Sequence, residues 1–187
     1  FRKAIVPKSA IITGFILSGV LDFNQDWYAL LIFSLVAVFS KYTLRVKNKH
    51  VFNPANFALF TAALFKQPLT WSIESNIYLI IIAGVYLALS LKKWPHVLGF
   101  FLVFFGLFYF SGVNPLNMIG WFFVFIMLIE PKTSGFGKLR GLIFGSIAGL
   151  TSFIMFKFMP QVDIFVTSLV VANAFNIFFD LKKKADS

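Results

Sequence analysis

Apolar and polar residues alternate along this chain in long blocks rather than with a short period. Polar, proline or glycine breaks separate eight apolar runs, which cover residues 11–21, 28–40, 57–65, 77–91, 97–110, 118–129, 141–159 and 164–179. Such runs are typical of membrane-crossing helices, although a straight crossing needs about 20 residues. The shorter runs must therefore tilt, include flanking polar residues or end inside the bilayer. The pattern predicts an all-α, polytopic membrane helix bundle of about eight segments, in one transmembrane domain over residues 1–187.

The composition supports a lipid environment. Hydrophobic residues make up 59% of the 187 residues and charged residues 13%, whereas a soluble domain has about 25% charged residues. We therefore expect the lipid bilayer as a partner, because such a chain has too little polar surface to cover itself in water. The net charge of +10 does not indicate nucleic acid, since the basic residues form short clusters between apolar runs. Cysteine is absent, which excludes thiolate metal sites.

The basic residues also predict how the segments are threaded. If the segments alternate in direction from a cytoplasmic N-terminus, every Lys and Arg except Lys66 and Lys157 falls on the cytoplasmic side. Adding or removing a middle span would scramble this positive-inside bias. We predict a multi-pass protein of the bacterial cytoplasmic (inner) membrane with both termini inside. The first run is interpreted as a retained span rather than a signal peptide, because no small-x-small cleavage site follows before Asp22.

Two stretches share an Asn-Pro-x-Asn spacing. The first contains Asn53, Pro54 and Asn56, and the second contains Asn114 and Asn117. Asparagine is a good N-cap and proline suits the first helical position, so each stretch predicts a helix start. In the predicted topology the two helices start from opposite faces, which is typical of an inverted-topology repeat whose broken helices point at a bound group. The alternative is two ordinary capped helices.

Small and polar residues mark the last two runs. Four glycines recur at every fourth position: Gly137, Gly141, Gly145 and Gly149. They leave one helix face nearly bare, which predicts close packing against another helix; a flat cofactor against this face is the alternative. In the final run, Asn173 and Asn176 are expected to face the interior, where they bond to other helices or contact a ligand.

The stretch E-P-K-T-S-G at residues 130–135 closes the sixth run at the cytoplasmic boundary. Proline ends the helix, and the hydroxyls of Thr133 and Ser134 with the following glycine predict a turn that could receive an anion. His50 and His96 each precede a span. We interpret both as surface residues, because a bis-histidine haem needs them on facing helices at one depth.

Two motifs carry a resemblance to a known family. F-N-P-A-N-F at residues 52–57 and I-E-P-K-T-S-G-F-G-K-L-R-G-L-I-F-G at residues 129–145 resemble the NqrB/RnfD membrane family. Its members belong to the sodium-translocating NADH:quinone oxidoreductase and to the Rnf electron-transport complex. The resemblance implies a bundle of inverted repeats that carries flavin and passes electrons among other membrane subunits. That family's Ser-Gly-Ala-Thr motif for covalent FMN has no match here, so we expect a non-covalent flavin or quinone instead.

These observations lead to one functional prediction and two alternatives. The prediction is a membrane subunit of a flavin- or quinone-linked electron-transport complex, with no catalytic residue and no metal site of its own. The cofactor-binding candidates are Asn53, Pro54, Asn56, Asn114, Asn117, Glu130, Thr133 and Ser134. The alternatives are a redox-silent scaffold subunit and a channel for a small solute, lined by the four asparagines of the two Asn-Pro stretches.

Overall fold

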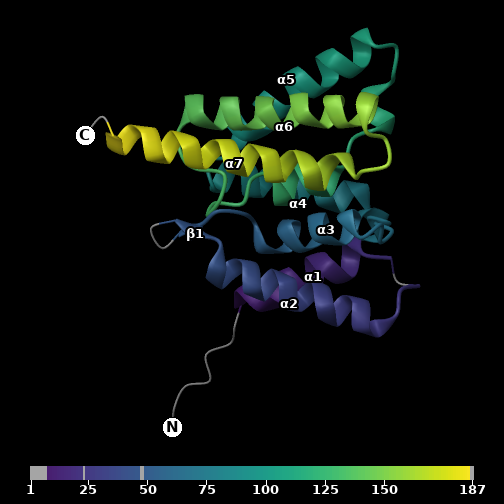
Figure 1. Cartoon of the computed structure of the whole chain (residues 1–187). Coiled ribbons are helices and arrows are strands. Elements are labelled where there is room, and N and C mark those ends of the chain that lie inside the picture. The colour runs from purple at the N-terminus through teal and green to yellow at the C-terminus, as the bar shows by residue number, and fades with distance from the viewer. Residues whose placement is uncertain (1–7, 23, 47–48, 186–187) are drawn as a thin grey trace.

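The computed structural model describes residues 8–22, 24–46 and 49–185, which fold into a helical bundle (Figure 1). The α-helices are α1 (Lys8–Val20), α2 (Trp27–Thr43), α3 (Pro54–Leu64), α4 (Ile77–Ser90), α5 (Trp94–Phe110), α6 (Lys138–Phe158) and α7 (Ile164–Ala185). The shorter elements are the 3-10 turns η1 (Ser72–Ser75) and η2 (Pro115–Asn117), the π-helix η3 (Phe123–Met127) and the strands β1 (Arg45–Val46) and β2 (Lys49–His50). The predicted all-α fold is confirmed, since the only sheet in the described ranges is this two-stranded hairpin.

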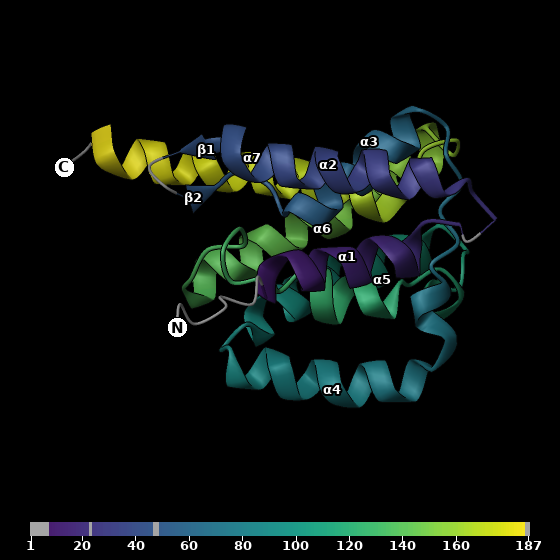
Figure 2. The same ribbon diagram turned by 90° about the horizontal axis from the view of Figure 1, so that it is seen from below.

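The helices lie side by side, and consecutive α-helices run in opposite directions except α5 and α6, which run parallel because the η3 segment crosses back between them (Figures 1 and 2). The hairpin, the end of α7 and the starts of α5 and α6 gather at one end, which we call the lysine-rich end. Its basic residues include Lys41, Arg45, Lys92, Lys93, Lys132, Lys138 and Arg140, and the backbone also places Lys49, Lys182, Lys183 and Lys184 at this end. The other end, called the opposite end, contains Lys66 and Lys157. Arg2, Lys3 and Lys47 of the predicted cytoplasmic set lie outside the described residues.

One predicted run does not form an α-helix along its length. Residues 118–129 begin with an irregular turn and continue into η3, in which the Leu128 amide donates to the Phe123 carbonyl at 2.8 Å. This bond spans five residues instead of the four of an α-helix, so the turn is wider than an α-helical turn. The segment still crosses from the opposite end to the lysine-rich end, so the alternating order of the eight runs is kept.

Length and hydropathy together single out one helix. Among the described residues, α6 is the one helix that is long and apolar enough to cross a membrane, and six shorter apolar helices accompany it. At about 1.5 Å per residue, the 21 residues of α6 are about 31 Å long, which matches a hydrocarbon core of about 30 Å. The 11 residues of α3 reach about half as far.

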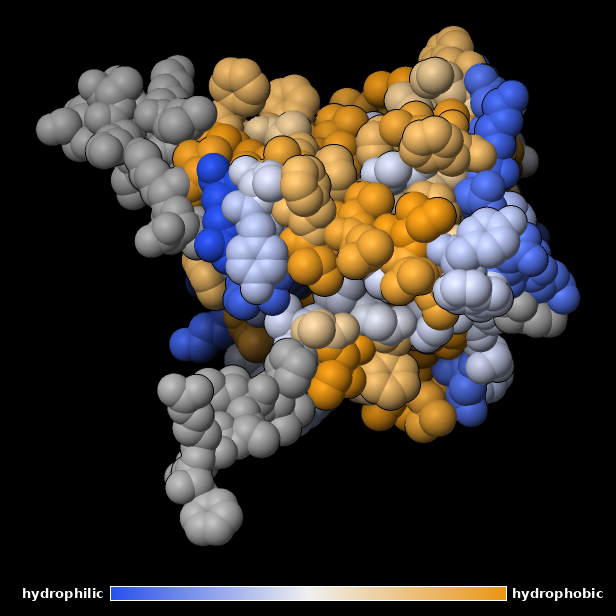
Figure 3. All heavy atoms as spheres, turned by 60° about the horizontal axis from the view of Figure 1, so that its bottom comes forward, coloured by the Kyte–Doolittle hydropathy of each residue, from blue (hydrophilic) through white to orange (hydrophobic). Residues whose placement is uncertain are grey.

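The surface separates apolar from polar residues along the helix direction. Large apolar side chains such as Phe15, Leu35, Ile82 and Leu102 are exposed on α1, α2, α4 and α5. On the face shown in Figure 3, a broad hydrophobic band lies between two hydrophilic rims. A water-soluble chain would have to solvate this band, whereas a bilayer matches it.

The glycine face of α6 packs directly on α5. A Cβ atom added to Gly145 would collide with the His96 carbonyl oxygen, and one added to Gly149 would lie 3.0 Å from the Phe100 carbonyl oxygen. The predicted close helix packing is therefore confirmed for this face. It is wrong for Gly137, which precedes α6 with a φ of 110° and has open space around the added atom.

Stacked phenylalanines fill the interior beside this contact. The ring centroids of Phe100, Phe104 and Phe108 follow one another along α5 at 4.9 and 4.3 Å. Phe123 from η3 and Phe165 from α7 stack at 4.9 Å and close the column from the other side. The centre of the bundle is thus a packed core of aromatic rings.

Candidate functional site

Seven polar side chains converge at the lysine-rich end, where α5 and α6 begin and η3 ends. We call this group the turn cluster; it consists of Lys93, His96, Glu130, Thr133, Ser134, Arg140 and Asn176. Four chain segments supply it: the start of α5, the turn at residues 130–135, the start of α6 and the second half of α7. Three of the predicted cofactor-binding residues, from the E-P-K-T-S-G stretch, therefore lie in one polar site.

Local hydrogen bonds build the turn. The Thr133 hydroxyl donates to the Glu130 carboxylate at 2.7 Å, and the Ser134 hydroxyl donates to the Glu130 carbonyl oxygen at 2.7 Å. Gly135 follows with a φ of 67°, a left-handed conformation that glycine adopts at no steric cost. The predicted turn is confirmed, and it holds both hydroxyls inside the protein.

Lys93 is the buried cation of the cluster. Its side chain has no solvent exposure, and its ammonium donates to the Ser134 hydroxyl at 3.0 Å and to the Gly135 carbonyl oxygen. The ammonium also lies 4.1 Å from the ring centroid of Phe136, within cation–π range. The pKa of Lys93 is lowered to about 8, mainly by burial and also by the nearby charge of Arg140, while the charge of Glu130 opposes the shift. Lys93 is therefore close to losing its proton under mildly alkaline conditions.

The pKa of Glu130 is shifted in the opposite direction from that of Lys93. Burial raises the pKa of its carboxyl group, and the hydrogen bond from Thr133 and the charges of Lys132 and Lys93 partly offset this. The site thus holds an acid and a base whose charged forms are both disfavoured by burial. Groups of this kind exchange protons more readily near neutral pH than exposed ones do.

His96 bonds to the same turn. Its Nε2 atom lies 2.8 Å from the Ser134 carbonyl oxygen, so Nε2 carries the proton and donates it. Nδ1 is buried against Gly141 and has no hydrogen-bond partner among the described residues. The interpretation of His96 as a surface residue is therefore wrong, because α6 packs close enough on α5 to cover it.

Arg140 and Asn176 join α6, α7 and the turn. Arg140 Nε donates to the Asn176 side-chain oxygen at 2.6 Å, and the Asn176 amide donates to the Thr133 carbonyl oxygen at 2.5 Å. The predicted interhelical bonding is confirmed for Asn176. Asn173, one turn earlier, is fully buried, and neither of its side-chain polar atoms has a partner in the part of the chain that is described.

The first Asn-Pro stretch starts α3, as predicted. Asn53 accepts a hydrogen bond from the Asn56 amide at 3.2 Å, and Pro54 is the first helical residue. The Asn56 side chain donates to the Val166 carbonyl oxygen of α7 at 2.9 Å. All three residues of the motif are buried, so they join α3 to α7 within the bundle.

The second Asn-Pro stretch lies at the opposite end and has a different structure. The Asn114 side chain accepts from the Leu116 amide at 3.0 Å and caps only the short turn η2. Asn114 and Asn117 are both exposed. The eight predicted site residues thus occupy three separate places: the start of α3, the opposite end and the turn cluster.

Sequence reasoning missed Lys93, His96 and Arg140 as site residues. In the sequence Lys93 is notable only as one of the basic residues that predict the membrane topology. Its hydrogen-bond partners are 41 and 42 residues away in the chain. The available signal was the spacing of Lys93 and His96, three residues apart at the start of an apolar run, which puts both on one helix face.

No family model, no curated protein and no solved structure matches this chain. The resemblance to the electron-transport family therefore rests on the two motifs at residues 52–57 and 129–145. The first motif starts α3 and is largely buried. The second supplies the buried Thr133 and Ser134 of the turn cluster and the glycine face of α6, whereas its residues 136–139 are exposed.

Proposed function

We propose that this chain is a polytopic membrane subunit of an electron-transport complex, and that the turn cluster holds a non-covalent flavin or quinone. The band of exposed apolar side chains between polar ends supports the bilayer placement (Figure 3). The resemblance of residues 129–145 to a flavin-carrying family supports the redox role. The other membrane subunits of the complex are its protein partners.

The observation that carries the proposal is the convergence of three nitrogen donors on one turn. Lys93, His96 and Arg140 surround residues 133–135, and no solvent reaches Lys93. Flavins and quinones present carbonyl oxygens, which accept hydrogen bonds from such donors. The chemistry of the donor set therefore fits either group, although a bound carbonyl would have to take the place of the turn oxygens that accept these bonds now.

Each residue has a defined part in this proposal. Lys93 would donate a hydrogen bond to a cofactor oxygen, and its lowered pKa would let it supply a proton at that oxygen. Thr133 and Ser134 would orient the same oxygen, and Arg140 holds the turn against α7. The cofactor would supply the electron-transfer chemistry, and the chain would supply position and protons.

An absorption spectrum tests the proposal. Protein purified gently from membranes is expected to carry flavin absorption that acid precipitation releases into the supernatant, or else extractable quinone. Lys93→Met should reduce the bound cofactor about tenfold, the loss of one hydrogen bond from a charged group. Lys92→Met is the matched control, because Lys92 is the exposed neighbour in the same connection. Wild-type protein without flavin or quinone would overturn the proposal.

A redox-silent scaffold subunit is the second candidate. The stacked phenylalanines and the direct contact of α5 with α6 fill the interior without leaving room for a planar group between those helices. A colourless preparation that copurifies with the same membrane proteins each time would favour it. A channel lined by the asparagines is not proposed, because Asn53 and Asn56 are buried at α3 and Asn114 and Asn117 are exposed at the opposite end.

A further inference from the structure

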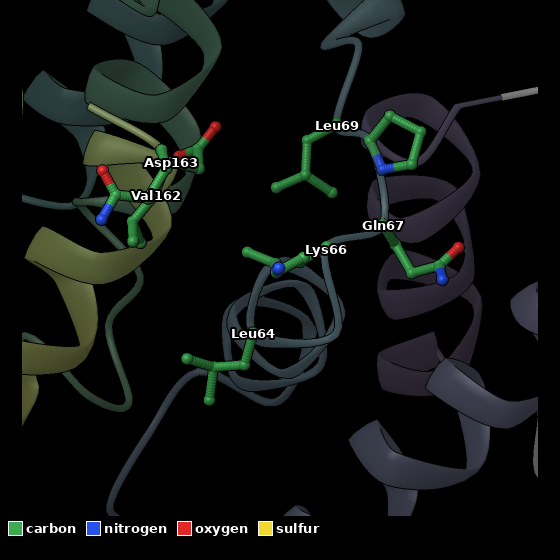
Figure 4. Close-up of a pocket in the computed structure, with 9 residues that line it drawn as sticks. Leu64, Lys66, Gln67, Leu69, Val162 and Asp163 are labelled. Carbon is green, nitrogen blue, oxygen red and sulfur yellow. The ribbon is translucent and has the colours of Figure 1, made fainter. Parts of the chain in front are cut away.

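A cavity of about 580 Å³ lies at the opposite end, away from the turn cluster (Figure 4). It is lined by the end of α3, the connection that follows it and the connection before α7. Apolar side chains on its wall include Ala63, Leu64, Leu69 and Val162. The volume is within the range of small-molecule sites, about 300–1,000 Å³.

Two opposite charges line this cavity. In Figure 4, Lys66 and Leu69 lie on one side of the opening, and Val162 and Asp163 lie on the other. Among the described residues no ion pair joins Lys66 to Asp163, and the Lys66 ammonium has no hydrogen-bond partner. The amides of Gln67 and Gln161 add neutral polar groups to the lining.

Asp163 is held rigidly in its wall. One carboxylate oxygen accepts from the amides of Phe165 and Val166 at 2.9 Å, and the other accepts from the Trp71 ring nitrogen at 2.8 Å. These bonds cap α7 and attach it to the connection after α3. The negative charge therefore keeps a fixed position, and a carboxylate oxygen accepts more than one hydrogen bond, so it can still receive a donor from a ligand.

Lys66 occupies a backbone position that usually takes glycine. It has a φ of 57°, and its amide donates to the Ala63 carbonyl oxygen where α3 ends. A left-handed residue at this point of a helix is commonly glycine or asparagine, because other side chains are strained there. The end of α3 does not require a lysine at this strained position, and the lysine places a cation in the wall of the cavity.

We propose that this cavity binds the head group of a zwitterionic phospholipid that carries a primary amine, with its phosphate on Lys66 and its ammonium on Asp163. The Lys66 cation, unpaired among the described residues, and the fixed carboxylate of Asp163 match the two charges of a phosphoethanolamine group, and the apolar wall matches the glycerol and the upper acyl chains. The cavity adjoins Leu64 and Phe65, which are exposed next to the apolar band, so the chains can continue into the bilayer. This inference rests on the proposed bilayer placement but not on the electron-transport role.

Native mass spectrometry of the delipidated protein tests the inference. Phosphatidylethanolamine is expected to bind at least about tenfold more tightly than phosphatidylglycerol with the same chains, since the glycerol head group lacks the ammonium that pairs with Asp163. Lys66→Asn should weaken the binding of phosphatidylethanolamine about tenfold. The fold should be kept, because asparagine tolerates the left-handed backbone conformation. Lys157→Asn is the matched control, because Lys157 is the exposed cation at the end of α6.

Three results would overturn the inference. Equal binding of the two lipids would indicate a nonspecific anion contact, and unchanged binding in Lys66→Asn with unaltered thermal unfolding would remove Lys66 from the site. Soluble phosphoethanolamine that binds as tightly as the lipid would identify a soluble zwitterion as the ligand instead. Membrane fractionation separates these outcomes from a failure of the bilayer placement, and the flavin spectrum tests the redox role independently.

Discussion

The two ends of the bundle use similar residues in opposite ways. At the lysine-rich end, Lys93 and Asn176 are buried, and both donate hydrogen bonds to the turn at residues 130–135. At the opposite end, Lys66 faces a cavity, and Asn117 is exposed in a short turn. The difference teaches that residue type and spacing do not decide the role of a polar group; the helix packed on top of it does.

The closure of the lysine-rich end comes from one helix contact. Gly141 and Gly145 of α6 let the start of α5 approach so closely that His96 and Lys93 are covered. The opposite end has no such contact over Lys66, and it stays open as a cavity. Changes to this contact should therefore have the largest effect on the difference between the ends.

Gly145→Leu should give that largest effect. The new side chain collides with the α5 backbone at His96, so we expect a loss of about 3 kcal/mol or more in the free energy of unfolding, or failure to assemble. Gly106→Leu is the matched control, because nothing lies within 4 Å of a Cβ atom at that α5 position. Thermal unfolding in detergent measures both variants. Equal stability of the two would show that α6 does not pack on α5 in this way.

The stability of the protein should rise with pH above about 8. The folded-state pKa of Lys93 is about 8, whereas an unfolded lysine has a pKa of about 10.4. Between these values the unfolded chain binds the extra proton, so unfolding becomes less favourable by at most about 1.4 kcal/mol per pH unit. Below pH 8 both states are protonated, and the contribution is constant. Glu130 from the turn and Arg140 from α6 are the charges that act on Lys93.

The measurement is the free energy of unfolding in detergent from pH 7 to 10. Lys93→Met should abolish the rise, whereas Lys66→Asn at the opposite end should keep it. A rise of the same size in Lys93→Met would assign it to another group and would contradict the buried, bonded position of Lys93.

Features of the sequence that act over a few residues were predictable. The cap at Asn53, the turn that starts at Glu130 and the glycine face around Gly145 each depend on neighbours in the same segment. The eight runs and the clustering of lysines at one end follow from the same blocks of apolar residues. The all-α bundle could therefore be derived from the amino-acid sequence alone.

Features that depend on distant partners were not predictable. The burial of Lys93 requires Ser134, 41 residues away, and the bond of Asn56 requires Val166, 110 residues away. The second Asn-Pro stretch has the same spacing as the first, but the segment after it forms a π-helix, and nothing covers Asn117. Spacing predicts a cap, whereas only packing decides whether the cap is also a contact.

Asn56→Ala should cost more stability than Asn117→Ala. The first change removes the buried hydrogen bond from α3 to the Val166 carbonyl oxygen, and we expect a loss of about 1–2 kcal/mol. The second change removes an exposed side chain and should alter stability by less than about 0.5 kcal/mol. Denaturant unfolding in mixed micelles compares the two. If Asn117→Ala were the more harmful change, the second stretch would be a buried contact in the folded protein.

The two cap residues give the smallest and most specific contrast. Asn53→Ala removes the side-chain acceptor for the Asn56 amide at the start of an 11-residue helix, so we expect a loss of about 1 kcal/mol. Asn114→Ala removes an acceptor from a three-residue turn that is open to solvent, where water replaces the bond, and we expect a loss below about 0.5 kcal/mol. The same unfolding assay measures both, and Asn53→Asp, which keeps the acceptor, should recover most of the loss at α3.

Equal losses at the two positions would mean that the stretches are structurally equivalent, as an inverted repeat with two matching helix starts requires. Unequal losses would mean that only the first stretch stabilises a helix, so that any functional loss in Asn114→Ala without unfolding would have to come from a contact made at the opposite end.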